Sequence, residues 1–201
     1  MKRSEINEII LRSEEFIRSF QFILPPFASW TPEMWREKGH ECDEIRDNML
    51  GWDITDWGSG NMDEVGLVLF TLRNGNQKLP QYKKPYAEKL LISQEGQLCP
   101  MHFHWNKMED IINRGGGTLV MQLYCSEQEE LDRNAAVEIV SDGVRMTLEP
   151  GALLELQPGQ SVTLPQKVYH AFWAKRGTGP VLIGEVSQCN DDESDNRFWQ
   201  A

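Results

Sequence analysis

From residue 65 onward, short runs of β-branched, aromatic and leucine residues alternate with clusters of Gly, Pro, Asn and Asp. Runs of this length bounded by turn residues predict β-strands. No helical pattern that could act as a crossover separates them, so we expect an antiparallel sandwich or jelly roll. The predicted strands are 65–72, 87–93, 98–104, 118–125, 137–139, 144–148, 152–156, 161–164, 168–174 and 181–187.

The N-terminal part of the chain has a different pattern. Apolar residues between positions 4 and 20 recur at helical spacing, with Ser4 as the expected N-cap. Thr31 followed by Pro32 predicts the start of a second helix, which we expect to end by Gly39. We expect these helices to cover one side of the sheet or to form a dimer contact.

These two patterns predict one domain over residues 1–201. Residues 1–60 are expected to form a helical or irregular extension, and residues 61–201 a β-barrel core. The acidic stretch 126–134 is expected to be a solvated loop or short helix. The three glycines at 115–117 precede a predicted strand rather than a helix, so they favour a strand connection over a phosphate-binding loop.

Composition narrows the function classes. With 40% hydrophobic and 25% charged residues, the chain has the composition of a soluble globular protein. The formal net charge of -11 argues against nucleic-acid or anionic-membrane partners, which require basic patches. The longest apolar run, 65–70, is too short to cross a bilayer, and the N-terminus lacks the features of a signal peptide. Four cysteines without a CxxC pair favour reduced thiols in the cytoplasm.

A metal site is predicted from three histidines and one glutamate. His102 and His104 are two residues apart in a predicted strand, so both imidazoles point to the same face. A short turn brings Glu109 to the same place, and His170 lies in another predicted strand. Three imidazoles and a carboxylate suit a divalent transition metal and leave coordination positions open for substrate.

The spacing of these residues resembles the two motifs of the cupin superfamily. The first motif is matched by Gly96, His102, His104, Glu109 and Gly116, and the second by Gly159, Pro165 and His170. Lys167 replaces a usual glycine and Ala174 a common asparagine, which bears on the local turn and the subfamily rather than on the metal ligands. The resemblance implies a mainly β fold, a cupin jelly-roll sandwich or barrel with N-terminal helices.

A finer resemblance covers most of the chain. Residues 87–92, 100–117 and 184–198 are similar to those of the cupin-type D-lyxose isomerases. This resemblance implies an aldose–ketose isomerase whose substrate is a monosaccharide, converting D-lyxose to D-xylulose and often D-mannose to D-fructose. It also implies Mn²⁺ as the typical metal and a homodimer. The ligand types alone also tolerate Zn²⁺, Co²⁺ and Fe²⁺.

Such an isomerase passes through a cis-enediolate intermediate, so it needs a base beside C1 and C2. Glu185 is the expected base, because it lies in an otherwise apolar strand where burial would raise its pKa towards neutrality. The alternative is a glutamate at a sheet edge in water. Lys89 is the expected proton donor or enediolate stabiliser; the alternative is an exposed lysine at a strand end. The sequence leaves open which of the two moves the C1/C2 proton.

Four further residues are candidates for contacts with the sugar. Only the family resemblance implies that Asp195 binds hydroxyls and that Arg197 donates a hydrogen-bond fork, since the acidic tail 191–197 resembles a solvated segment. Trp105 is expected either to wall the sugar pocket or to belong to the core. Gln122 is expected to contact the sugar in the same way.

Two other functions remain open at the level of sequence. An iron-dependent cupin dioxygenase or oxidase would use the same ligand set, and only an isomerase would react without consuming oxygen. A non-catalytic sugar-binding cupin would show no turnover at all.

Overall fold

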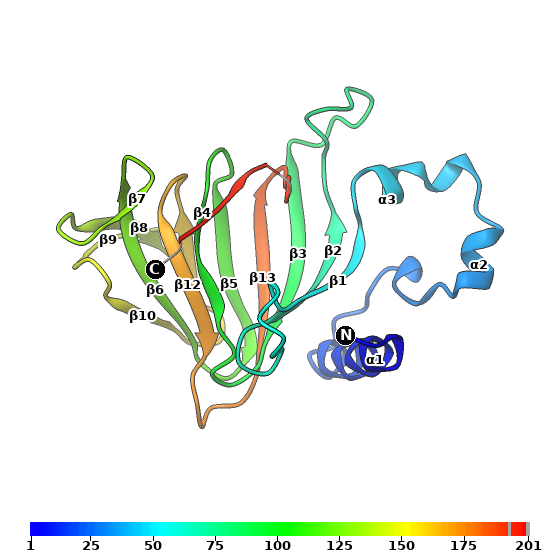
Figure 1. Ribbon diagram of the computed structural model, residues 1–201, viewed down its shortest axis with the longest axis horizontal. Helices are drawn as coiled ribbons and strands as arrows, with labels where there is room; N and C mark the ends of the chain where they lie inside the picture. Colours follow the sequence, from blue (N-terminus) through cyan, green and yellow to red (C-terminus); the bar gives the residue numbers. More distant parts are fainter. Residues whose placement is uncertain (193, 200–201) are drawn as a thin grey trace.

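The computed structural model describes residues 1–192 and 194–199, and in this part of the chain two curled β-sheets lie face to face (Figure 1). The larger sheet contains eight strands and the smaller contains five in a continuous order, with one more strand at its side. Helical segments come first along the chain, as expected. The fold is therefore mainly β, and the predicted jelly roll with N-terminal helices is confirmed.

The secondary structure consists of an N-terminal helical set and the strands of the two sheets. The helical segments are α1 (Arg3–Ser19), η1 (Pro26–Ser29), α2 (Pro32–Arg36), η2 (His40–Cys42) and α3 (Asp43–Asp47). The larger sheet contains, in spatial order, β1 (Gly51–Thr55), β2 (Leu67–Arg73), β3 (Tyr86–Ser93), β13 (Val181–Gln188), β5 (Glu109–Gly116), β11 (Ser161–Leu164), β8 (Val137–Ser141) and β9 (Val144–Leu148). The smaller sheet contains β10 (Leu153–Leu156), β6 (Leu119–Glu127), β12 (Tyr169–Ala174), β4 (Cys99–His104) and β14 (Asn196–Phe198), and β7 (Glu130–Asp132) pairs with β6.

Every strand predicted from the sequence is present, with bounds that differ by a few residues at most. Four strands were not predicted: β1, β5, β7 and β14. Strand β1 begins at Gly51, so the sheet starts inside the segment that was expected to be helical or irregular. Gly115 and Gly116 end β5, and Gly117 lies in the short connection to β6, in agreement with the predicted strand connection.

The expectation for the acidic stretch 126–134 is wrong. Its residues form a hairpin between β6 and β7, in which Glu127 pairs with Glu130. Gln128 and Glu129 form the two-residue turn, with φ values of 49° and 73°. Both values lie in the left-handed region, which is the geometry that joins two antiparallel strands with the correct twist. The acidic composition of this segment therefore indicated its exposure to solvent but not its secondary structure.

Helix α1 covers the outer face of the larger sheet (Figure 1). Ile17 packs in a cluster with Phe70 of β2 and Ile92 of β3. The helix starts at Arg3, with Lys2 rather than Ser4 at the N-cap, because Glu5 accepts the Lys2 backbone N–H at 2.7 Å. Thr31 caps α2 as predicted, accepting the Met34 N–H at 3.3 Å.

The main hydrophobic core lies between the two sheets. Its members include Ile111 of β5, Met121 of β6 and Phe172 of β12. Among the described residues, no helix combines the length and apolar character needed to cross a membrane. The polar site described next lies beside this core.

Candidate active site

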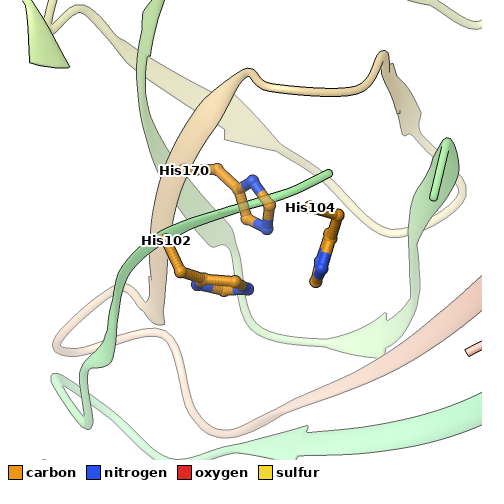
Figure 2. Close-up of side chains that lie close together, drawn as sticks. All are labelled: His102, His104 and His170. Atoms are coloured by element: carbon orange, nitrogen blue, oxygen red, sulfur yellow. The ribbon is translucent and has the colours of Figure 1, made fainter. Parts of the chain in front are cut away.

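The three histidines predicted as ligands come together between β4 and β12. His102 and His104 point to the same face of β4, and His170 lies opposite His102 in the antiparallel β4–β12 pair. Figure 2 shows the three rings turned toward one another, and each contributes a ring nitrogen to a group whose members all lie within 4.8 Å of one another. This spacing is compatible with one shared metal ion.

Glu109, the first residue of β5, joins the histidines from the opposite sheet. Its Oε1 lies 3.4 Å from His104 Nε2 and 3.1 Å from His170 Nε2. The side chain is buried, and Oε1 has no hydrogen-bond partner among the described residues. A buried oxygen without a partner is costly unless something else binds it.

The ring orientations fit metal binding. His102 Nδ1 lies 2.7 Å from the Pro100 carbonyl and His170 Nδ1 lies 3.0 Å from the Val168 carbonyl. A carbonyl only accepts, so each Nδ1 carries the proton and each Nε2 presents a lone pair to the site. Burial, with the adjacent His170 and His104, holds the pKa of His102 well below its usual value, so this ring stays neutral. Neutral imidazoles and a carboxylate form a suitable ligand set for a divalent transition metal.

A lysine that the sequence did not single out lies directly behind this group. Lys107 is 3% exposed, and its Nζ lies 2.9 Å from Glu109 Oε2 and 2.9 Å from Glu185 Oε1. Burial alone would lower its pKa, but the two carboxylates raise it above the usual value. Lys107 lies in the connection between β4 and β5, where the alternation of a strand does not apply, so no local sequence pattern would have identified it.

Both residues expected to handle protons lie in the same centre. Glu185 of β13 and Lys89 of β3 are direct cross-strand neighbours, with 3.5 Å between Lys89 Nζ and Glu185 Oε1. Glu185 is 4% exposed and Lys89 is 3% exposed. The alternatives of an edge glutamate in water and an exposed lysine are therefore wrong.

The predicted direction of the Glu185 pKa shift is also wrong. Burial alone would raise the pKa, but the positive charges of Lys107 and Lys89 outweigh burial and hold it below its usual value. Glu109 behaves in the same way, because Lys107 and His104 outweigh burial and hold its pKa well below the usual range. Both carboxylates are therefore ionised at neutral pH.

A cavity of about 370 Å³ opens onto these residues. The histidines, Glu109 and the two lysines line it together with Glu185. Asp53 of β1 and Asp192, which follows β13, add two more carboxylates to its lining. Burial and the negative charge of Asp192 raise the pKa of the Asp53 carboxyl. Trp57 and Phe198 form an aromatic part of the wall, with ring centroids 6.2 Å apart.

Asp195 lies beside the site but does not line the cavity. Its Oδ1 accepts the Asn106 backbone N–H at 2.7 Å, and its Oδ2 accepts the Lys107 backbone N–H at 3.1 Å. These bonds hold the turn between β4 and β5, so the geometry supports a structural role rather than the predicted hydroxyl contact. Glu193, in the same predicted tail, lies outside the described residues.

The other three predicted sugar contacts also point away from the cavity. On β14 the neighbours Asn196 and Phe198 line the cavity, so the alternate residue Arg197 faces outward, where its Nη2 lies 3.6 Å from Glu130 Oε1. Trp105 packs edge-on against Phe103, with ring centroids 4.7 Å apart. Gln122 donates to the Gly151 carbonyl at 3.3 Å. The geometry supports none of the three as a cavity residue.

Comparison with known proteins gives one consistent result. The family model described as D-lyxose isomerase matches residues 1–201. The D-lyxose/D-mannose isomerase of Escherichia coli O157:H7 is 46% identical over 201 residues, covering 100% of this chain and 88% of that protein. The protein of the same name from Serratia proteamaculans is 45% identical with the same coverage.

Solved structures agree on the fold. The L-ribose isomerase of Geodermatophilus obscurus superposes with a TM-score of 0.63 at 17% identity, covering 100% of this chain and 93% of that chain. The L-ribose isomerase of Acinetobacter sp. DL28, in complex with L-ribose, gives a TM-score of 0.61 at 16% identity, covering 98% and 92%.

Proposed function

The chain belongs to the D-lyxose isomerase family, and from this premise we propose that it is a metal-dependent enzyme interconverting D-lyxose with D-xylulose and D-mannose with D-fructose. That it is an aldose–ketose sugar isomerase follows from the family. The metal and the named sugars are the proposal. The observation that supports it is the cavity in which three histidines that could hold a metal and Glu109 lie beside two buried lysines and the buried carboxylate of Glu185.

The reaction sets three requirements for the protein. One proton must leave C2 and return at C1, a hydroxyl proton must move between O2 and O1, and the charge that develops on these oxygens must be stabilised. A divalent cation held by His102, His104, Glu109 and His170 would act as a Lewis acid toward the sugar oxygens. We propose Mn²⁺ for this site.

We assign to Glu185 the transfer of the proton between C2 and C1. Its carboxylate is ionised, and its Oε1 accepts bonds from Lys107 Nζ at 2.9 Å and Ser187 Oγ at 3.0 Å. These contacts fix the side chain in the cavity, as a base that works between two adjacent carbons requires. The carboxylate takes the proton from C2 of the aldose and, as the acid, returns it to C1 of the ketose.

We assign to Lys89 and Lys107 the hydrogen bonds to the sugar oxygens. Both ammonium groups are buried within reach of Glu185, so they can donate hydrogen bonds to the oxygens of a bound sugar while that carboxylate moves the carbon proton. Lys89 is the proposed donor of the oxygen proton. Asp53 and Asp192 are the proposed acceptors for hydroxyl groups further along the sugar, in place of the outward-facing residues named from the sequence.

The proposal is tested by anaerobic incubation of metal-stripped protein with D-lyxose, with and without Mn²⁺, while D-xylulose is measured. Metal-dependent ketose formation without oxygen is the expected result, and it excludes the oxidase and binding-protein alternatives. Absence of conversion of D-lyxose, D-mannose and related aldoses with any divalent metal would refute the proposal.

Three broader properties belong to the same proposal. We propose a single domain, a homodimer and a cytoplasmic location, each motivated by the sequence. Sedimentation of the purified protein measures the mass in solution, and a monomer at micromolar concentration would contradict the dimer. Limited proteolysis tests the single domain, because a stable fragment beginning near residue 61 would contradict it.

A further inference from the structure

Asn190 connects the two buried lysines. It lies just beyond the end of β13, and its Oδ1 accepts hydrogen bonds from Lys89 Nζ at 2.7 Å and from Lys107 Nζ at 3.4 Å. Ammonium groups only donate, so the amide must present its oxygen to the lysines. Asn190 is therefore a neutral acceptor set among charged groups of the reaction centre.

The backbone of Asn190 is held by a second asparagine. The Oδ1 of Asn74 accepts the Asn190 N–H at 3.0 Å, and the Nδ2 of Asn74 donates to the Asn190 carbonyl at 3.1 Å. Asn74 is itself 5% exposed and exchanges side-chain-to-backbone bonds with Asn48, at 3.1 Å and 3.4 Å. One amide group thus fixes both polar atoms of the Asn190 backbone, and a third asparagine fixes that amide.

The distances show what this arrangement does to Lys89. Its Nζ is 2.7 Å from the Asn190 oxygen but 3.5 Å from Glu185 Oε1. The first distance is that of a strong hydrogen bond, and the second is at the limit of one. The position of the ammonium group is therefore set by the neutral amide more than by the oppositely charged carboxylate.

We propose that Asn190, fixed by Asn74, is a positioning residue that holds Lys89 back from Glu185. Without it, the ammonium group would move closer to the carboxylate and shorten the existing 3.5 Å ion pair. A second short ion pair, added to that of Lys107 at 2.9 Å, would weaken Glu185 further as a base and withdraw Lys89 from the sugar oxygens. The inference rests on the proposed function, in which Glu185 and Lys89 have separate tasks.

The kinetic test compares four variants with the wild-type enzyme loaded with Mn²⁺. Asn190→Ala is expected to lower kcat about 10- to 100-fold with little change in KM, because misplacement of a catalytic group by about 1 Å costs that much. Asn190→Asp keeps an oxygen acceptor and is expected to recover at least half of that loss on a logarithmic scale. Asn74→Ala is expected to lower kcat less than Asn190→Ala, because it acts only through Asn190.

Asn76→Ala is the matched control. Asn76 lies in the same loop as Asn74 and donates to the Asp47 carbonyl at 3.1 Å and to Asn48 Oδ1 at 3.2 Å. It therefore touches the outer end of the asparagine network, but neither bond reaches Asn74, Asn190 or the two lysines directly. This variant is expected to lose stability but keep the wild-type kcat per folded molecule. A kcat loss as large as that of Asn190→Ala would show that the effect is only structural, and would overturn the proposal.

A second measurement does not depend on turnover. In protein labelled with ¹³C and ¹⁵N in its lysines, the Lys89 side-chain signal, assigned with Lys89→Arg, is expected to shift in Asn190→Ala and to stay in place in Asn76→Ala. An unchanged Lys89 signal or a wild-type kcat in Asn190→Ala would overturn the positioning role. If the wild-type protein converts no aldose, the proposed function fails, and the Lys89 signal still tests the geometry.

Discussion

The four charged side chains at the centre of the cavity form a row in which positive and negative groups alternate. Glu109, Lys107, Glu185 and Lys89 lie in contact one after another, with distances of 2.9, 2.9 and 3.5 Å between the charged atoms. Two ammonium groups and two carboxylates cancel in formal charge. In a buried place each of them depends on its partners, because a single buried charge without a partner is strongly destabilising.

Glu185→Gln tests the assigned base. The amide keeps the volume of the side chain but cannot take a proton from carbon, so kcat is expected to fall about 100- to 10,000-fold. Glu185 is not among the proposed metal ligands, so the amount of Mn²⁺ bound per chain, measured by elemental analysis, is expected to be unchanged. A variant with more than a tenth of the wild-type kcat would remove Glu185 from the role of base.

Asp53→Asn tests the acidic part of the cavity wall through pH. The raised pKa of Asp53 means that the folded state binds this proton more tightly than the unfolded chain, so its contribution to stability is lost as pH rises through the folded pKa. Asp53 is exposed by its surface area, so water screens much of this effect, and the variant is expected to have only a slightly higher Tm than wild type at pH 7. The gain is expected to vanish below about pH 4, where the carboxyl is protonated in both states. A gain that does not change with pH would contradict this account.

At the residue scale, the sequence was enough to predict the proposed metal ligands but not the charged residues that contact them. His102 and His104 could be predicted because a two-residue spacing places both on one face of any strand. The burial of Lys107 depends partly on Glu185, which is 78 residues further along the chain, and no local pattern records that contact. Burial of Glu185 was foreseen from its apolar strand, but the sign of its pKa shift was decided by two lysines from other segments.

Among the elements, α1 offers a clear case of a helix that stabilises without taking part in the chemistry. Ile17→Ala removes a side chain that is 1% exposed and is expected to lower the free energy of unfolding by about 2 to 4 kcal/mol. Denaturant titration measures this loss, and kcat per folded molecule is expected to stay at the wild-type value.

Leu11→Ala is the control on the same helix. Leu11 is 62% exposed, so the same kind of truncation is expected to change the free energy of unfolding by less than about 0.5 kcal/mol. Equal losses in the two variants would show that α1 is not docked on β2 and β3 through Ile17.

Strand β5 was missed from the sequence for a reason that its own residues show. Strand β5 has the sequence EDIINRGG, in which Glu109 and Asn113 are buried beside Ile111. The buried face of β5 is partly polar at both ends. At its first residue, Glu109 lies in the candidate site. Further along, Asn113 donates to the backbone carbonyls of Gly117 and Leu156. Hydrophobic alternation therefore fails on a strand that carries function.

For the molecule as a whole, the four proposed metal ligands come from both sheets, since Glu109 belongs to the larger and the histidines to the smaller. A metal that binds only the folded state stabilises it, by about 2.7 kcal/mol at a concentration of 100 times Kd. Removal of metal by a chelator is therefore expected to lower Tm, and addition of Mn²⁺ to restore it.

Two histidine variants test whether this stabilisation arises at the proposed site. His170→Ala is expected to abolish the rise in Tm on addition of Mn²⁺. His40→Ala changes a histidine that lies on the surface and pairs with Asp43, so its rise in Tm is expected to equal that of wild type. Calorimetry with and without Mn²⁺ measures both, and an unaltered response in His170→Ala would place the metal elsewhere.

The place of β13 has a consequence for the synthesis of the protein. This strand lies between β3 and β5 in the larger sheet, although it follows both by many residues in the chain. Until the ribosome has made residue 188, the edges of β3 and β5 that β13 will cover have no partner, and the apolar residues Leu90 and Ile92 of β3 lack the neighbour Leu182. Unpaired edges of this kind promote association between nascent chains. We therefore expect a chain that ends before Val181 to aggregate under conditions in which the full-length chain stays in the supernatant, as measured by centrifugation of the lysate.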